Sequence, residues 1–201
     1  MTRQVWVALS VLAATALFAS SARSGAALEP PLRMPLSTAK ATHPEGQEFP
    51  RLICSDDSRE IVVDGTQFPA SALGSGVLDQ TACRWFGGEA IPAETTGTLA
   101  GVATKQILSF VAPATGDPPL LYDVLATGNP ADFDTVLDVM TAAFGPGEQT
   151  ASPGAVGPRL QWRLPNLSAS IARQDRDTGL LTIEYTDEGL EAVALGIGSP
   201  Q

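Results

Sequence analysis

Histidine and lysine are almost missing from this chain of 201 residues: His43 is the single histidine, and Lys40 and Lys105 are the only lysines. A Ser-His-Asp or Cys-His nucleophile needs an imidazole base held in place by packing. His43 lies in a proline-rich stretch without apolar periodicity, so this class of enzyme is not expected. The formal net charge of −10 repels phosphate backbones. Nucleic acid is therefore not a predicted partner.

Cysteine is also scarce, since Cys54 and Cys83 are the only two. Their spacing does not match C-x-x-C, and no histidine lies nearby to complete a zinc site. An isolated pair in an oxidising compartment is typical of a structural disulfide, which would close a loop of roughly 30 residues and contribute about 3–4 kcal/mol. A redox-active or metal-binding pair is the alternative. We predict the disulfide, and we predict no metal or cofactor.

Long apolar runs are absent except for Val5–Phe18, which is shorter than the roughly 20 residues that a membrane-spanning helix needs. Arg3 precedes this run and small residues follow it, as in a secretory signal peptide over residues 1–22. Cleavage is expected after Ala22 or after Ala26. No cysteine follows for lipidation. The sequence therefore predicts a periplasmic or secreted protein with no membrane insertion after cleavage.

The rest of the chain divides by composition. Residues 23–50 are rich in proline, alanine, serine and threonine, which predicts a disordered tether. Residues 51–195 suit a single domain. Within it, residues 51–100 form the part held by the disulfide, where the pattern leaves the structure open, and residues 101–195 form the core. Residues 196–201 are predicted to be a frayed tail.

The clearest pattern in the chain predicts a helix between Asn129 and Gly145. Asn129 suits the N-cap, Pro130 suits the first turn, and Gly145 suits a left-handed C-terminal residue. Apolar residues between them recur at helical spacing, at Phe133, Val136, Leu137, Met140 and Phe144. This helix needs an apolar partner surface.

Alternating or β-branched residues predict five strands around this helix: Val102–Val111, Leu120–Thr127, Leu160–Leu164, Leu167–Ile171 and Leu181–Tyr185. The order is β-β-α-β-β-β. We therefore predict an α+β fold in which an antiparallel sheet of about five strands carries the helix on one face. Trp162 and Ile183 would meet the helix.

The opposite face of that sheet is predicted to be polar, because strand residues alternate between faces. It is solvated, covered by the N-terminal segment, or a binding surface. The candidate binding residues are Gln161, Arg163, Ser168, Ser170, Thr182 and Glu184. Three arginines, Arg159, Arg163 and Arg173, either pair with Glu184 and Asp175 on neighbouring strands or form a small anion-attracting patch. We favour cross-strand pairing.

Two other groups of residues carry alternative chemistry. A hydrolase without histidine would use Asp56 and Asp57 as a glycosidase-type acid pair with Asp187 or Glu188, although acidic residues in an acidic protein are more often solvated. The pair Trp85–Phe86 next to Cys83 is either core or an exposed patch that meets a partner. We favour core.

The helix from Phe133 to Gly145 with Pro146, a loop, and then Trp162 in a strand meander resembles many small uncharacterised secreted bacterial proteins. More distantly, it is similar to outer-membrane assembly lipoproteins of the SmpA/OmlA type, without their lipidated cysteine. The resemblance supplies no catalytic residues. The leading hypothesis is an exported, non-enzymatic protein that binds an envelope protein or a small ligand through the sheet face. The alternative is a hydrolase that uses acidic residues.

Overall fold

Strands dominate the computed structural model, which describes residues 28–41, 50–74, 80–88, 90–150, 157–174 and 179–197. The earlier strands are β1 (Arg51–Cys54), β2 (Glu60–Val63), β3 (Thr66–Pro69), β4 (Gln80–Gly87), β5 (Ala93–Glu94) and β6 (Gly97–Leu99). The later strands are β7 (Val102–Val111), β8 (Leu120–Gly128), β9 (Glu148–Gln149), β10 (Arg159–Leu164), β11 (Leu167–Ala172) and β12 (Leu181–Asp187).

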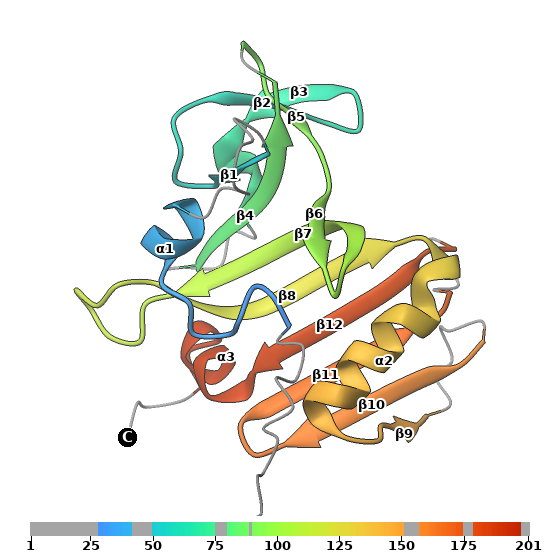
Figure 1. The fold of residues 1–201 in the computed structure, drawn as a ribbon. Helices are drawn as coiled ribbons and strands as arrows, with labels where there is room; N and C mark the ends of the chain where they lie inside the picture. The colour runs from blue at the N-terminus through green and yellow to red at the C-terminus, as the bar shows by residue number, and fades with distance from the viewer. Residues whose placement is uncertain are drawn as a thin grey trace, which may run out of the picture.

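These strands form one twelve-stranded sheet in the order β3-β2-β5-β4-β7-β8-β12-β11-β10-β9, with β1 paired to β4 and β6 paired to β7 (Figure 1). In the described part of the chain there are three short α-helices: α1 (Leu36–Ala41), α2 (Phe133–Phe144) and α3 (Glu188–Ala194). Single 3-10 turns cover Ala70–Leu73 and Pro130–Asp132.

The predicted α+β fold with about five antiparallel strands is therefore wrong. The fold is mostly sheet, and the sheet is mixed because β2 and β5 pair in parallel at Val62 and Ala93. The five predicted strands exist as β7, β8, β10, β11 and β12, but the sheet continues through β4 into residues 51–99. Apart from β4, the strands there are only two to four residues long. Such short segments show too few alternations for the pattern to identify them.

The predicted helix is confirmed as α2. Asn129 Oδ1 accepts a hydrogen bond from the Ala131 N–H at 3.0 Å, and Gly145 ends the helix with a φ of 84°. The helix packs on β10–β12, where the Trp162 indole N–H donates to the Gly145 carbonyl at 2.7 Å. The Phe144 and Trp162 rings lie 6.3 Å apart. This pairing fixes the end of α2 against the sheet.

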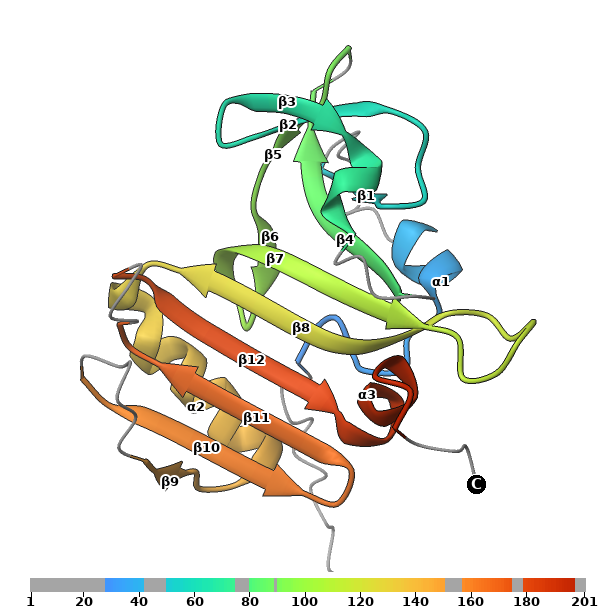
Figure 2. The ribbon, with the colours of Figure 1, turned by 180° about the vertical axis from the view of Figure 1, so that it is seen from behind.

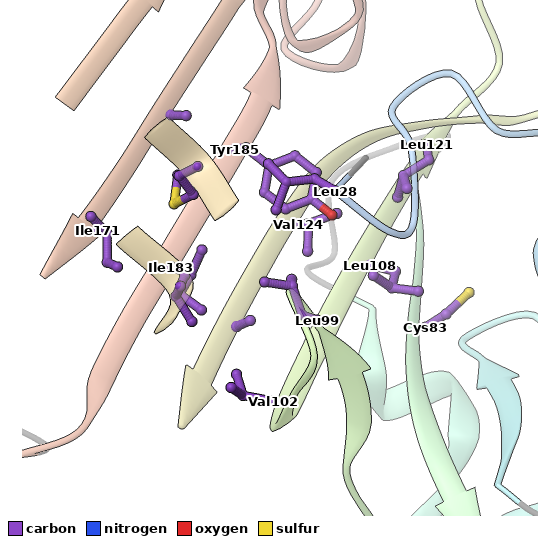
Figure 3. Close-up of a cluster of buried hydrophobic side chains, with 14 of the residues drawn as sticks. Leu28, Cys83, Leu99, Val102, Leu108, Leu121, Val124, Ile171, Ile183 and Tyr185 are labelled. Carbon is purple, nitrogen blue, oxygen red and sulfur yellow. The ribbon is translucent and has the colours of Figure 1, made fainter. Parts of the chain in front are cut away.

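The main hydrophobic cluster lies between α2 and the sheet and continues beneath the N-terminal segment (Figure 3). Ile171, Ile183 and Tyr185 from the meander join Phe133 and other apolar side chains in it. The Tyr185 hydroxyl is the polar edge of this cluster, and burial raises the pKa of this phenol. The predicted meeting of meander and helix is therefore present.

Residues 28–41, which we call the N-terminal arm, pack against the sheet although their composition predicted a tether. Leu28 and Ala39 are buried in the main cluster. The backbone of the arm also bonds to β8, since Leu121 N–H donates to the Met34 carbonyl at 2.9 Å. Composition did not predict this packing, because the arm has only a few apolar residues and they show no periodicity. These few residues are enough to hold the arm in place, since its backbone is also hydrogen-bonded to a strand.

The predicted disulfide between Cys54 and Cys83 is present. The two residues face each other on the paired strands β1 and β4. A second, smaller cluster lies on the far side of these strands and consists of Ile53, Ile61, Val63, Ala70 and Phe86. Phe86 is thus core, as predicted, whereas Trp85 is only partly buried. None of the helices in the described ranges has the length and apolarity to cross a membrane.

Candidate binding groove

The meander β10–β11–β12 places the predicted binding residues on one surface. Gln161 lies opposite Ser170, and Arg163 lies opposite Ser168. Ser170 in turn faces Glu184 on β12. Their neighbours along each strand point the other way, toward α2. The alternation predicted from the sequence therefore puts these five side chains on the outer face of the sheet.

This outer face is hollowed into a groove of about 490 Å³, which we call the outer-face groove. Its lining comprises Arg159, Gln161, Trp162, Arg163, Leu164, Ser168, Ala169, Ser170, Glu184, Thr186, Glu188 and Glu191. Five of the six predicted residues are among them. Thr182 is on the same face, opposite Ala172, but lies outside the lining.

Helix α3 supplies one wall of the groove through Glu188 and Glu191. Figure 2 shows this helix directly after the end of β12. Asp187 caps this helix, because its Oδ1 accepts from the Leu190 N–H at 3.0 Å. Arg33 of the N-terminal arm binds the other oxygen of Asp187 at 2.6 Å. The pKa of Asp187 is lowered overall: burial alone would raise it, but the hydrogen bonds from Arg33 and the Leu190 N–H outweigh burial. The wall is therefore held at its first turn.

A third apolar cluster attaches the rest of α3 to the sheet, and it consists of Val111, Tyr122, Leu190 and Ala194. Tyr122 reaches this side because the pairing of β7 and β8 shifts register between Ser109 and Phe110. The shift leaves Tyr122 without a partner on β7, so both Tyr122 and Asp123 face outward. Such a bulge redirects side chains next to functional surfaces in many sheets.

The groove is electrically asymmetric. Arg159 and Arg163 lie on β10, while Glu184 on β12 and Glu188 and Glu191 on α3 lie across the floor. The positive side of such a groove attracts the negative groups of a bound molecule, and the negative side attracts its positive groups. A ligand with separated positive and negative groups therefore has a preferred orientation here.

The predicted pairing of Arg163 with Glu184 is absent among the described residues. Within the described ranges Arg163 and Glu184 form no ion pair with any residue. Strand β11 separates them, which puts their backbones about 10 Å apart. Arg173 binds Asp134 at 2.8 Å and lies over the Phe133 ring at 4.7 Å, on the α2 side. Its other proposed partner, Asp175, lies outside the described residues.

Asp123 is a partly desolvated acid next to the groove. Burial, followed by the nearby charges of Glu184 and Glu191, raises its pKa to about 6. A hydrogen bond from the Thr186 hydroxyl at 2.8 Å opposes this shift. Asp123 therefore changes charge within the physiological pH range.

Sequence reasoning missed the part of the groove beyond Tyr185. Thr186 continues the outward alternation of β12, and its position was readable from the pattern. Glu188 and Glu191 are three residues apart, which is the spacing of neighbours on one helix face. Their approach to β10–β12 depends on how α3 folds back onto the sheet, and no local pattern encodes that.

The predicted acid pair is not assembled. Lys40 binds both Asp56 and Asp57, at 3.1 and 3.2 Å, while Asp187 is bound by Arg33. Asp56, Asp57 and the Cys54 sulfur also form the one cluster of potential metal ligands in the described ranges. The Lys40 ammonium already occupies the cation position, and the Cys54 sulfur is in the disulfide. This corner is therefore an ion-pair site.

No family model matches the sequence, and neither a curated protein nor a solved structure matches the chain. The resemblance to secreted bacterial proteins and to SmpA/OmlA-type lipoproteins therefore stays a prediction. Function has to be inferred from the groove itself.

Proposed function

We propose that this protein is an exported, non-enzymatic binding protein whose outer-face groove holds a charged segment of a partner protein in the cell envelope. The observation that carries this proposal is the separation of charges across the groove. Arg163 and Glu184 are both exposed and lack an ion pair within the described chain, so their charges are available to a ligand. A protein segment with acidic and basic side chains offers the complementary pattern.

The location outside the cytoplasm rests on the disulfide and on the signal-like N-terminus. Disulfides persist in oxidising compartments such as the periplasm, and the bond between Cys54 and Cys83 is present. Residues 1–22 lie outside the described part of the chain. N-terminal sequencing of the exported protein should start at Arg23 or at Ala27. An intact Met1 on protein recovered from the cytoplasm alone would contradict export.

The binding proposal is tested by neutralising one charge on each side of the groove. The double variant Arg163→Gln with Glu184→Gln keeps the net charge and replaces exposed side chains, so its melting temperature should equal that of the parent. Partner recovery from a native envelope extract should fall roughly tenfold, because rim charges steer and orient association.

A matched control is available at the start of β2, where Arg59 directly precedes the strand and Glu60 is its first residue. Arg59→Gln with Glu60→Gln also removes one positive and one negative charge from exposed residues, far in sequence from the groove. This control should recover the partner as the parent does. Added salt should weaken recovery for the parent and have less effect on the groove variant. Equal recovery by both double variants would defeat the proposal.

A hydrolase that uses acidic residues is the second candidate. The observation that favours it is the pKa of Asp123 near 6, since a general acid must hold a proton near neutral pH. Its test is the turnover of nitrophenyl glycosides. A hydrolysis rate above background that disappears in Asp123→Asn would support this activity, and a background rate in the parent chain would remove it.

A further inference from the structure

A second cavity, of about 620 Å³, lies between the N-terminal arm and the strands β4, β6 and β7. We call it the Trp85 cavity. Its described lining consists of Glu29, Pro30, Pro31, Met34, Ala39, Pro50, Trp85, Thr96, Gly97, Thr98, Ala103, Gln106 and Leu108. It has no residue in common with the outer-face groove. Small-molecule sites typically have this size and a mostly apolar lining.

The arm side of the cavity is fixed to the sheet at several points. The Tyr185 hydroxyl donates to the Pro30 carbonyl at 2.8 Å. Arg33 N–H donates to the Leu121 carbonyl at 2.7 Å, and Leu121 N–H donates back to the Met34 carbonyl at 2.9 Å. Pro30 and Met34 therefore stay in place, which makes this wall pre-formed.

The sheet side presents Trp85 in one defined orientation. Its indole N–H donates to Gln106 Oε1 at 2.9 Å, and Gln106 Nε2 donates to the Thr104 hydroxyl, also at 2.9 Å. A Cβ on Gly97 would lie 2.6 Å from the Trp85 Nε1, so the indole is packed directly on the backbone of β6. The polar edge of the ring is thus satisfied inside the protein, which leaves apolar ring surface for the cavity.

The charge around this cavity restricts its ligand. Glu29 is the one charged residue among the described residues that line it, and a carboxylate at the mouth repels anions. Thr96, Thr98 and Gln106 are the uncharged polar residues of this lining, and most of the other lining residues are apolar. We propose that the Trp85 cavity binds a small, uncharged, apolar ligand with an aromatic ring that packs on Trp85, and that it discriminates against anionic analogues. This site is independent of the outer-face groove.

Two fluorescent probes with nearly the same ring system test this selectivity. N-phenylnaphthylamine is uncharged, whereas anilinonaphthalene sulfonate adds a sulfonate to the same two aromatic groups. Titrated into the purified full chain, the uncharged probe should bind at micromolar concentration with saturable fluorescence enhancement. The sulfonate should bind at least about tenfold more weakly. No saturable binding of the uncharged probe, or equal affinity for both probes, would overturn the proposal.

A pair of threonine variants locates the probe. Thr98 is exposed on β6 and lines the cavity, so Thr98→Trp should fill the mouth and raise the Kd of the uncharged probe at least about tenfold. Thr66 is an exposed strand threonine on β3, outside the cavity, and Thr66→Trp should leave the Kd unchanged. Equal affinity in both folded variants would place the probe elsewhere and overturn the proposal.

Trp85→Phe provides the second variant, because it keeps an aromatic ring but loses area and the bond to Gln106. This substitution should raise the Kd of the uncharged probe by about threefold to tenfold. An unchanged Kd in a variant that melts like the parent would show that the ligand does not pack on Trp85.

Discussion

The two halves of the sheet are stabilised in different ways. The half formed by β7, β8 and β10–β12 has strands of six to ten residues and a large cluster beneath α2. The half around β1–β5 has, apart from β4, strands of two to four residues and a cluster of five buried residues. The disulfide lies where the halves meet: Cys54 and Cys83 belong to the main cluster, while Phe86 on the same strand β4 belongs to the small one. Burial dominates the first half, and a covalent link supplements burial in the second.

The largest effect is expected from Phe133→Ala in the helix-covered half. Phe133 is 2% exposed in the main cluster, and truncating a buried phenylalanine costs roughly 3–5 kcal/mol of unfolding free energy. Chemical denaturation measures this loss, with Phe133→Leu as a control that should lose much less. A loss below about 1 kcal/mol for the alanine variant would mean that α2 does not hold this half together.

Removing the disulfide should be the next largest effect. Cys54→Ala with Cys83→Ala opens a loop closed by residues 29 apart in sequence, which in the chain-entropy model costs about 3–4 kcal/mol. Hydrogen exchange should show the greatest loss of protection in β1–β4 and little change in β10–β12. Uniform loss of protection across both halves would contradict the division of the sheet.

Asp123→Asn should stabilise the protein at alkaline pH. The folded carboxyl keeps its proton up to about pH 6, and an unfolded one releases it near about pH 4, so the folded state binds more protons between these values. Stability therefore falls as pH rises from about 4 to about 6 and stays lower above that.

The amide of the Asp123→Asn variant cannot ionise, although its oxygen can still accept from Thr186. The variant should be more stable than the parent by about 2 kcal/mol at about pH 8. Denaturation between about pH 5 and pH 8 tests this, because Asp187, whose pKa is lowered, stays charged in that range. A parent chain whose stability rises with pH over that interval would refute the desolvation of Asp123.

The smallest effect is expected from Lys40→Met, which removes a contact between the N-terminal arm and the disulfide half. Lys40 binds Asp56 and Asp57 near the surface, and such pairs contribute about 0.2–1 kcal/mol. The difference from the parent should shrink as salt is added. A loss as large as that of the disulfide variant would show that the arm, rather than the covalent link, stabilises this half.

Sequence patterns predicted the structure where one segment carries its own periodicity. The helix from Phe133, the meander through Trp162 and Ile183, and the disulfide were all readable. The residues of β1–β6 were not, because most of these strands are too short to alternate visibly and depend on partners distant in sequence. The packing of the N-terminal arm around Leu28 was not predicted for a related reason, since the arm is held by backbone hydrogen bonds to β8, which is distant in sequence.

The candidate site divides in the same way. Gln161, Arg163, Ser168, Ser170 and Glu184 follow from alternation within strands, and they line the groove. The remaining side of the groove comes from α3, and the acid Asp123 is desolvated by tertiary packing. Periodicity identifies which face a residue occupies, but only the assembled sheet shows what covers that face.

Site-specific photo-crosslinking tests the central claim most directly. A photoreactive side chain in place of Ser170, on the floor of the outer-face groove, should crosslink one envelope protein in living cells, and neutralising Arg163 and Glu184 together should abolish the product. The same group in place of Ser58, an exposed serine in the disulfide half, should give no such product. Identical products from both positions, or no product from Ser170, would contradict the account.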